Sequence, residues 1–190
     1  MLTSYIRISL QPVVLSLLCL QLIMIILGGF FFSTTAAYNE YIAQGEWWRF
    51  ITSLFIHVDL QHFLSNSICL FFLGQSIEKQ LGSIPFTIVF FTSGISGNIF
   101  SYFIMPLGYV HAGSSGGVFG LLGAQLFLLY SRYRSSQSQD LLLFSSIIFL
   151  LLLFTFFNQS ANPISHLTGL LVGGICTPLL IKKIDGAELI

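Results

Sequence analysis

The chain has 190 residues, of which 55% are hydrophobic and only 7% are charged, and its formal net charge is zero. A soluble domain carries about a quarter charged residues, so this composition indicates lipid rather than water as the surrounding solvent. The balanced charge also gives no reason to expect a nucleic acid or an acidic macromolecule as a partner.

The first apolar run, from about Leu10 to Phe32, follows Arg7 near the N-terminus. A secretory signal peptide also begins with a positive charge, but its apolar core is only about 7–15 residues long. A helix that spans a bilayer needs about 20 apolar residues, which this run provides. We therefore predict a first helix that is retained in the protein.

Five more apolar runs follow, separated by polar residues, glycines and prolines. A polar and aromatic stretch from Ser33 to Ile56 lies between the first run and the second. These runs predict an all-α membrane protein in which a single domain covers residues 1–190. Its six transmembrane helices are expected at about 10–32, 58–77, 84–105, 115–130, 141–157 and 164–181.

Basic residues predict the orientation of these six spans. One side of the membrane would receive only Arg49, and the other would receive Arg7, Lys79, Arg132, Arg134, Lys182 and Lys183. Loops rich in lysine and arginine stay in the cytoplasm, so both termini are predicted to be cytoplasmic. The second helix, expected to begin with His57, and the fourth and sixth helices then start at the outer face.

Three cysteines, Cys19, Cys69 and Cys176, lie far apart and each falls inside an apolar run. Their spacing matches neither a zinc site nor a disulfide framework. We interpret all three as small hydrophobic side chains that are buried in the protein. No metal and no cofactor are expected.

Polar residues recur in the first turns of the three helices that start at the outer face. His62 and Asn66 are four residues apart and share one helix face, Ser115 begins the fourth helix, and His166 lies near the start of the sixth. Polar groups inside a membrane segment are costly, so each needs a reason. All four should lie roughly 5–12 Å below the interface, which predicts one shared polar site.

These residue types suit acyl transfer to a serine. His166 has an ordinary pKa near neutrality and is a natural base for the Ser115 hydroxyl. The start of a helix offers free N–H groups to an oxyanion, and Asn66 and His62 can add side-chain donors. Asp59 is the only acidic residue within these ranges, and it lies at the outer end of the second span, so we predict a serine–histidine dyad without a buried carboxylate.

Several residues have plainer alternatives. The pattern Gly-X-Ser-Gly occurs twice, and Ser96 falls halfway along the third predicted helix, where a packing stripe of Ser93, Ser96, Gly97 and Ser101 is expected. Ser114 lies beside Ser115 and is not excluded. The paired glycines of the fourth and sixth helices are typical of close helix packing. His57 and His111 are interpreted as hydrated residues near the interface, with His57 supporting the loop before the second helix.

Five elements follow one another along the chain: Trp48-Arg49, His57 with His62 and Asn66, Glu78 to Ser83, Gly113-Ser114-Ser115-Gly116, and His166 to Gly169 with Gly173. This ordered set, from Trp47 to about Gly174, resembles the rhomboid family of intramembrane serine proteases.

The resemblance implies a minimal six-helix rhomboid-like bundle. The compactness of the chain and the lack of a transit segment lead us to expect a bacterial plasma or inner membrane. The resemblance also implies Ser115 as nucleophile, His166 as base, and His62 and Asn66 as oxyanion donors. Substrates would be single-span membrane proteins, cut in or next to their transmembrane segments, with the loop around Arg49 lying sideways in the outer leaflet. Residues 141–157 would form a gate and residues 158–163 a cap. Many relatives have tyrosine where this chain has Phe119, which keeps the ring that stacks on the histidine.

Two other functions remain open at this point. One is a catalytically inactive rhomboid-like protein that binds membrane clients, although such relatives usually lack the serine or the histidine. The other is a small transporter, but transporters often show inverted repeats and sites near the midplane, and neither is apparent here. The oligomeric state and the natural substrate are not readable from the sequence.

Overall fold

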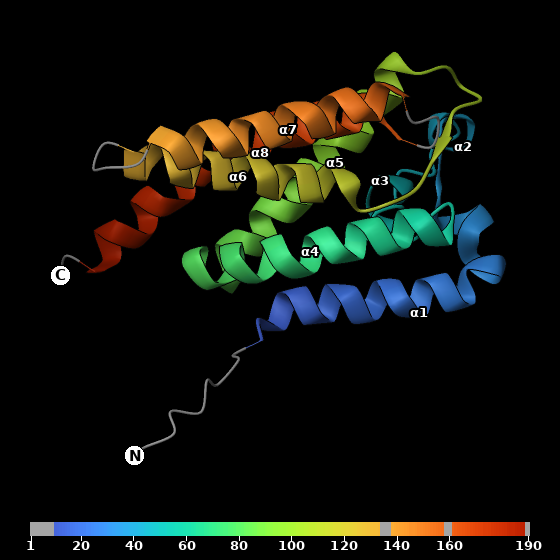
Figure 1. Ribbon diagram of the computed structural model, residues 1–190. Helices are drawn as coiled ribbons and strands as arrows, with labels where there is room; N and C mark the ends of the chain where they lie inside the picture. The colour runs from blue at the N-terminus through green and yellow to red at the C-terminus, as the bar shows by residue number, and fades with distance from the viewer. Residues whose placement is uncertain (1–9, 134–137, 158–160, 189–190) are drawn as a thin grey trace.

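The computed structural model describes residues 10–133, 138–157 and 161–188. Most of these residues are helical, as predicted, and six long helices run roughly alongside one another (Figure 1). They are α1 (Pro12–Thr35), α4 (Leu60–Leu81), α5 (Ser83–Ile104), α6 (Ser115–Tyr133), α7 (Ser138–Phe157) and α8 (Pro163–Glu188).

Local sequence accounts for several of the helix ends. Pro12 opens α1, where its missing N–H is not needed. The carboxylate of Asp59 accepts a hydrogen bond from the His62 amide and caps α4. This cap corrects the expected start of the second helix: His57 lies in the loop before α4. Gly82, with a φ of 83°, makes the sharp turn from α4 into α5.

The stretch between α1 and α4 is structured, and it departs from a purely helical fold. It contains the short helices α2 (Asn39–Ala43) and α3 (Arg49–Thr52). It also contains β1 (Ala37–Tyr38), which pairs antiparallel with β2 (Val110–His111) just before α6. This two-stranded contact ties the first loop to the segment that leads into Ser115.

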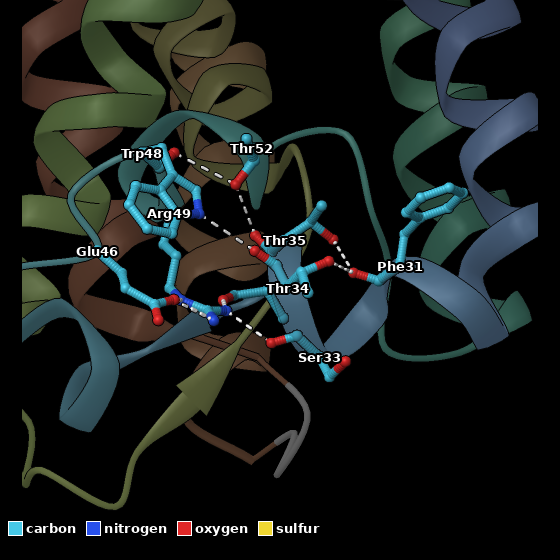
Figure 2. Close-up of polar contacts among 9 residues, drawn as sticks. Phe31, Ser33, Thr34, Thr35, Glu46, Trp48, Arg49 and Thr52 are labelled. Atoms are coloured by element: carbon cyan, nitrogen blue, oxygen red, sulfur yellow. Dashed lines mark hydrogen bonds and ion pairs between the residues drawn. The ribbon is translucent and has the colours of Figure 1, made fainter.

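Arg49 holds this first loop against the end of α1, as Figure 2 shows. Its guanidinium donates to Glu46 Oε2 at 2.7 Å and to the carbonyl oxygens of Ser33 and Ala36 at 2.9 and 2.7 Å. The side chain is 3% exposed. A buried charge is tolerated when it is paired and hydrogen-bonded, as this one is, so Arg49 has a structural function in the loop.

A second buried charge joins α1 to α4 at the opposite end of the helices. Glu78 accepts hydrogen bonds from the amides of Val13 and Val14 at 3.1 and 2.9 Å, and from the Ser83 hydroxyl at 2.7 Å. The first amides of a helix have no partner within it, and a carboxylate is the group that the helix dipole favours there.

Helices α5, α6 and α8 form the tightest part of the bundle because glycines remove the side chains between them. A Cβ on Gly169 would lie 2.1 Å from the Gly116 carbonyl oxygen, and one on Gly173 would lie 1.9 Å from that of Gly120. A Cβ on Gly97 would lie 2.4 Å from Ser165 Oγ. The packing interpretation of these glycines is therefore confirmed.

Large apolar side chains cover the outside of the bundle, among them Ile26, Phe30, Phe72, Phe103 and Phe149. Residues Ser83–Ile104 and Pro163–Ile181 are long and apolar enough to cross a membrane. The apolar parts of three other helices, Pro12–Gly28, Ser115–Ser131 and Leu141–Leu153, are shorter. Six complete spans therefore stay a prediction. Cys19 and Cys69 are exposed and Cys176 is half-buried, so the prediction that all three are buried is wrong.

Candidate active site

A cavity of about 270 Å³ lies among α4, α6, α7 and α8. All four predicted site residues, Ser115, His166, His62 and Asn66, line it. Helices α4, α6 and α8 supply these side chains, and α7 closes the cavity with Leu151 and Thr155. Three separate helices therefore bring the predicted polar groups to one place.

Ser115 is the first residue of α6 and is half-buried at the cavity wall. The residue two before it, Gly113, has a φ of 141°, a conformation that side-chain-bearing residues rarely adopt. Ser114 is fully buried and does not line the cavity, and Ser96 does not line it either. The structure thus distinguishes Ser115 from the two serines that the sequence left as alternatives.

His166 is 4% exposed, and its ring lies flat on Phe119, with centroids 4.2 Å apart and planes 11° apart. The expectation that Phe119 provides a stacking surface is confirmed. Within the part of the chain that the structure describes, neither ring nitrogen of His166 has a hydrogen-bond partner. No other described residue therefore competes for either nitrogen.

Asn162 fixes the turn that carries His166, and the sequence analysis did not single it out. Its Oδ1 accepts from the Ser165 amide at 3.0 Å, and its carbonyl accepts from the His166 amide at 3.0 Å. Its Nδ2 donates to Ser101 Oγ on α5 at 2.8 Å. An asparagine directly before a proline at a helix start is a recognisable cap signal.

Asn66 and His62 form the α4 wall of the cavity. Asn66 Nδ2 donates to the His62 carbonyl at 3.1 Å, which uses one of its two amide hydrogens and leaves the other for a ligand. The His62 ring lies against Gly113, where a Cβ would come within 2.6 Å of His62 Cε1. Only glycine fits at position 113, because the His62 ring packs directly against the backbone there.

His57 and His111 are buried, so the interpretation of both as hydrated residues is wrong. The His57 ring packs edge-on against His62 and Phe63, with centroids 5.4 and 5.6 Å apart. His111 Nε2 lies 3.0 Å from Asn98 Oδ1. Burial lowers the pKa of His57 to about 3 and that of His111 to about 4, because the charged forms lose their hydration. Both rings are neutral at physiological pH.

Asn98 on α5 anchors the segment before Ser115 from the opposite side. Besides contacting His111, it donates to the Phe50 carbonyl at 2.8 Å and to Ser53 Oγ at 2.9 Å. The Ser53 carbonyl in turn accepts from the Gly113 amide at 2.9 Å. This network positions the backbone of residues 111–113, and the sequence analysis missed it because the three segments meet only in the folded chain.

The chemistry of the cavity follows from its lining. It holds a hydroxyl at a helix N-terminus, an imidazole with both nitrogens free of partners among the described residues, and an amide with a spare hydrogen. Over residues 10–133, 138–157 and 161–188, no three His, Cys, Asp or Glu side chains gather closely enough to hold a metal ion. A hydroxyl, a base and oxyanion donors are the groups that acyl transfer uses.

The fold and the cavity define a helical membrane protein with a serine and a histidine in one site. The chain belongs to the rhomboid family: residues 44–183 match the rhomboid domain. It is 35% identical over 187 residues to the Bacillus subtilis protein named "Putative rhomboid protease YdcA", covering 93% of this chain and 92% of that one.

Two further relatives match over smaller shares of their lengths. Rhomboid protease GluP of Bacillus subtilis is 38% identical over 96 residues, which are 50% of this chain and 18% of GluP. Rhomboid-like protease 1 of Toxoplasma gondii is 30% identical over 154 residues, 79% of this chain and 53% of that protein. The family is one of intramembrane proteases, and the relatives include bacterial and eukaryotic proteins.

Proposed function

We propose that this protein is a serine endopeptidase that hydrolyses peptide bonds in or next to the transmembrane segments of membrane proteins, through a dyad of Ser115 and His166. The observation that carries the proposal is the shared cavity, in which Ser115 at the start of α6 and His166 stacked on Phe119 face the same space.

In this proposal His166 removes the proton from Ser115 Oγ as that oxygen bonds to the scissile carbonyl carbon. The free N–H groups at the start of α6, the spare amide hydrogen of Asn66 and the His62 ring stabilise the oxyanion. His166 then gives the proton to the departing amine. In the second step His166 takes a proton from the water that attacks the acyl-enzyme and returns it to Ser115 Oγ. Phe119 holds the plane of the imidazole, and orienting the imidazole is one part of what a buried carboxylate does in a triad.

The substrates in this proposal are single-span proteins of a bacterial plasma membrane. Six spans with cytoplasmic termini would place the cavity in the outer leaflet, because α4, α6 and α8 would then start at the outer face. Arg7 and Arg134, on which this orientation partly relies, lie outside the described residues, as do residues 158–160 of the expected cap.

The test is cleavage of a model single-span protein by the purified enzyme in liposomes. Ser115→Ala and His166→Ala should each lower the rate below detection, because removing either member of a nucleophile–base pair costs about 10⁶-fold in a well-studied soluble protease. Ser96→Ala, at the other Gly-X-Ser-Gly sequence, should cleave at the wild-type rate.

Two outcomes would count against the proposal. Full activity of Ser115→Ala with loss in Ser96→Ala would move the nucleophile to α5. Absence of cleavage by folded wild-type protein, with retained binding of the transmembrane substrate, would favour an inactive relative that binds membrane clients.

A further inference from the structure

Among the described residues that line the active-site cavity, Asp59 is the only one with a formal charge. The others on this wall are neutral polar groups such as Gln61, Ser65 and Asn66, or histidine and apolar side chains. Sequence analysis did not assign Asp59 a function, and the proposed acyl-transfer chemistry does not use it.

Asp59 has a defined position relative to the proposed dyad. It directly precedes α4, and its Oδ1 accepts from the His62 amide at 2.7 Å. It therefore lies about one turn, roughly 4.5 Å along the helix, outward of His62. The residue is exposed and also lines the cavity, so its carboxylate lies at the boundary between the cavity and the outside of the protein.

The carboxylate of Asp59 has no cationic partner within residues 10–133, 138–157 and 161–188. Arg49, the basic residue of the preceding loop, is buried and paired with Glu46. The helix dipole places about half a positive charge at the start of α4, which offsets the negative charge of the carboxylate only in part. The mouth of the cavity therefore carries a net negative charge among the described residues.

We propose that Asp59 determines substrate specificity: it favours substrates with a lysine or arginine within a few residues of the scissile bond, on the side that faces out of the membrane, and disfavours those with aspartate or glutamate there. The inference rests on the proposed function of the cavity and adds a substrate class to it. Charges across an interface act in this way mainly by excluding the wrong partner.

The test uses Asp59→Asn, since asparagine caps a helix about as well as aspartate and the substitution removes only the charge. The model substrate carries lysine, glutamine or glutamate at each of three positions on the outward side of the scissile bond. The quantity measured is the ratio of kcat/KM between lysine and glutamate substrates, in which changes common to all substrates cancel. The matched control is Glu40→Gln, which removes an exposed carboxylate that does not line the cavity.

We expect the wild-type ratio to reach about tenfold at one position or more, because the exposed carboxylate attracts the lysine substrate and repels the glutamate substrate. The ratio should fall to about twofold or less in Asp59→Asn and at high salt, and stay at the wild-type value in Glu40→Gln. A wild-type ratio near one, or an unchanged ratio in Asp59→Asn with an unchanged melting temperature, overturns the inference.

A binding measurement separates this inference from the proposed function. Fluorescently labelled substrates are titrated into Ser115→Ala protein, with and without Asp59→Asn. A lysine-over-glutamate preference in Kd that depends on Asp59 supports the inference even if the wild-type protein cleaves nothing, an outcome that would defeat only the proposed function. Equal Kd values for the two substrates count against Asp59.

Discussion

At the scale of residues, the packing of His166 on Phe119 shows that an aromatic ring, and not only a carboxylate, can orient an imidazole. The two rings are parallel and 4.2 Å apart, which fixes the plane of the imidazole while leaving both nitrogens unbonded to described residues. The ring of phenylalanine provides this surface as well as tyrosine would, since the contact is made by the face of the ring.

Phe119→Ala should therefore lower kcat/KM by about tenfold, because an aromatic pair contributes about 0.5–1.5 kcal/mol and the imidazole loses its support. Phe119→Tyr should stay within about threefold of wild type. Both rates are measured on the model substrate and divided by the fraction of folded enzyme, since Phe119 also packs on Leu122 and Ile148. Equal losses in the two variants would mean that adding a hydroxyl at position 119 is as harmful as removing the ring, which would contradict a function of the ring face alone. No loss in Phe119→Ala would remove the ring from the mechanism.

The four predicted site residues lie in one cavity because their placement depends only on helix register and on which helices start at the same face. Asn98, Asn162 and the burial of His57 and His111 depend on contacts between segments far apart in sequence, and no local pattern predicts those contacts. The same limit explains Cys19 and Cys69, since an apolar run does not show which of its faces is covered.

At the scale of elements, apolar runs located all six long helices, and the local capping chemistry decided their ends. The second helix begins at Leu60 because Asp59 caps it, although the apolar pattern begins earlier. The sixth predicted helix, expected to end at residue 181, continues past Lys182 and Lys183 to Glu188. The two short strands escaped prediction because two-residue pairing has no sequence signature of its own.

Adjacent glycines on α8 give a matched test of the packing. Gly173→Ala should destabilise the protein by about 1–3 kcal/mol or more, because its Cβ would lie 1.9 Å from the Gly120 carbonyl oxygen and backbone must move. Gly174→Ala should change stability little, since its nearest neighbour lies at an ordinary 3.6 Å. The measurement is the thermal unfolding midpoint in detergent, and equal midpoints for the two variants would contradict this packing of α6 against α8.

At the scale of the whole molecule, the orientation in the membrane decides what the cavity can reach. The exposed apolar side chains and two clear spans are those of a membrane protein, and the loop after α5 and the turn after α4 lie at opposite ends of the bundle (Figure 1). Composition predicted the membrane environment, and the asymmetry of basic residues predicts which end faces the cytoplasm.

Single cysteines in a chain without Cys19, Cys69 and Cys176 test that orientation. Leu107→Cys, in the loop before β2, should react with a membrane-impermeant maleimide on intact cells. Lys79→Cys, near the end of α4, should react only after the cells are permeabilised. Both positions are exposed, so access to the reagent is limited by the membrane. The reverse labelling pattern would place the termini outside and the cavity in the inner leaflet.

The central claim is that His166 activates Ser115, and a fluorophosphonate probe tests it most directly because the probe bonds covalently only to activated serines. Purified wild-type protein is treated in detergent beside folded Ser115→Ala and His166→Ala variants, and the modified peptide is located by mass spectrometry. We expect label on Ser115 in the wild type and none in either variant. Label on another serine, undiminished labelling of His166→Ala, or no label on folded wild-type protein would contradict the dyad.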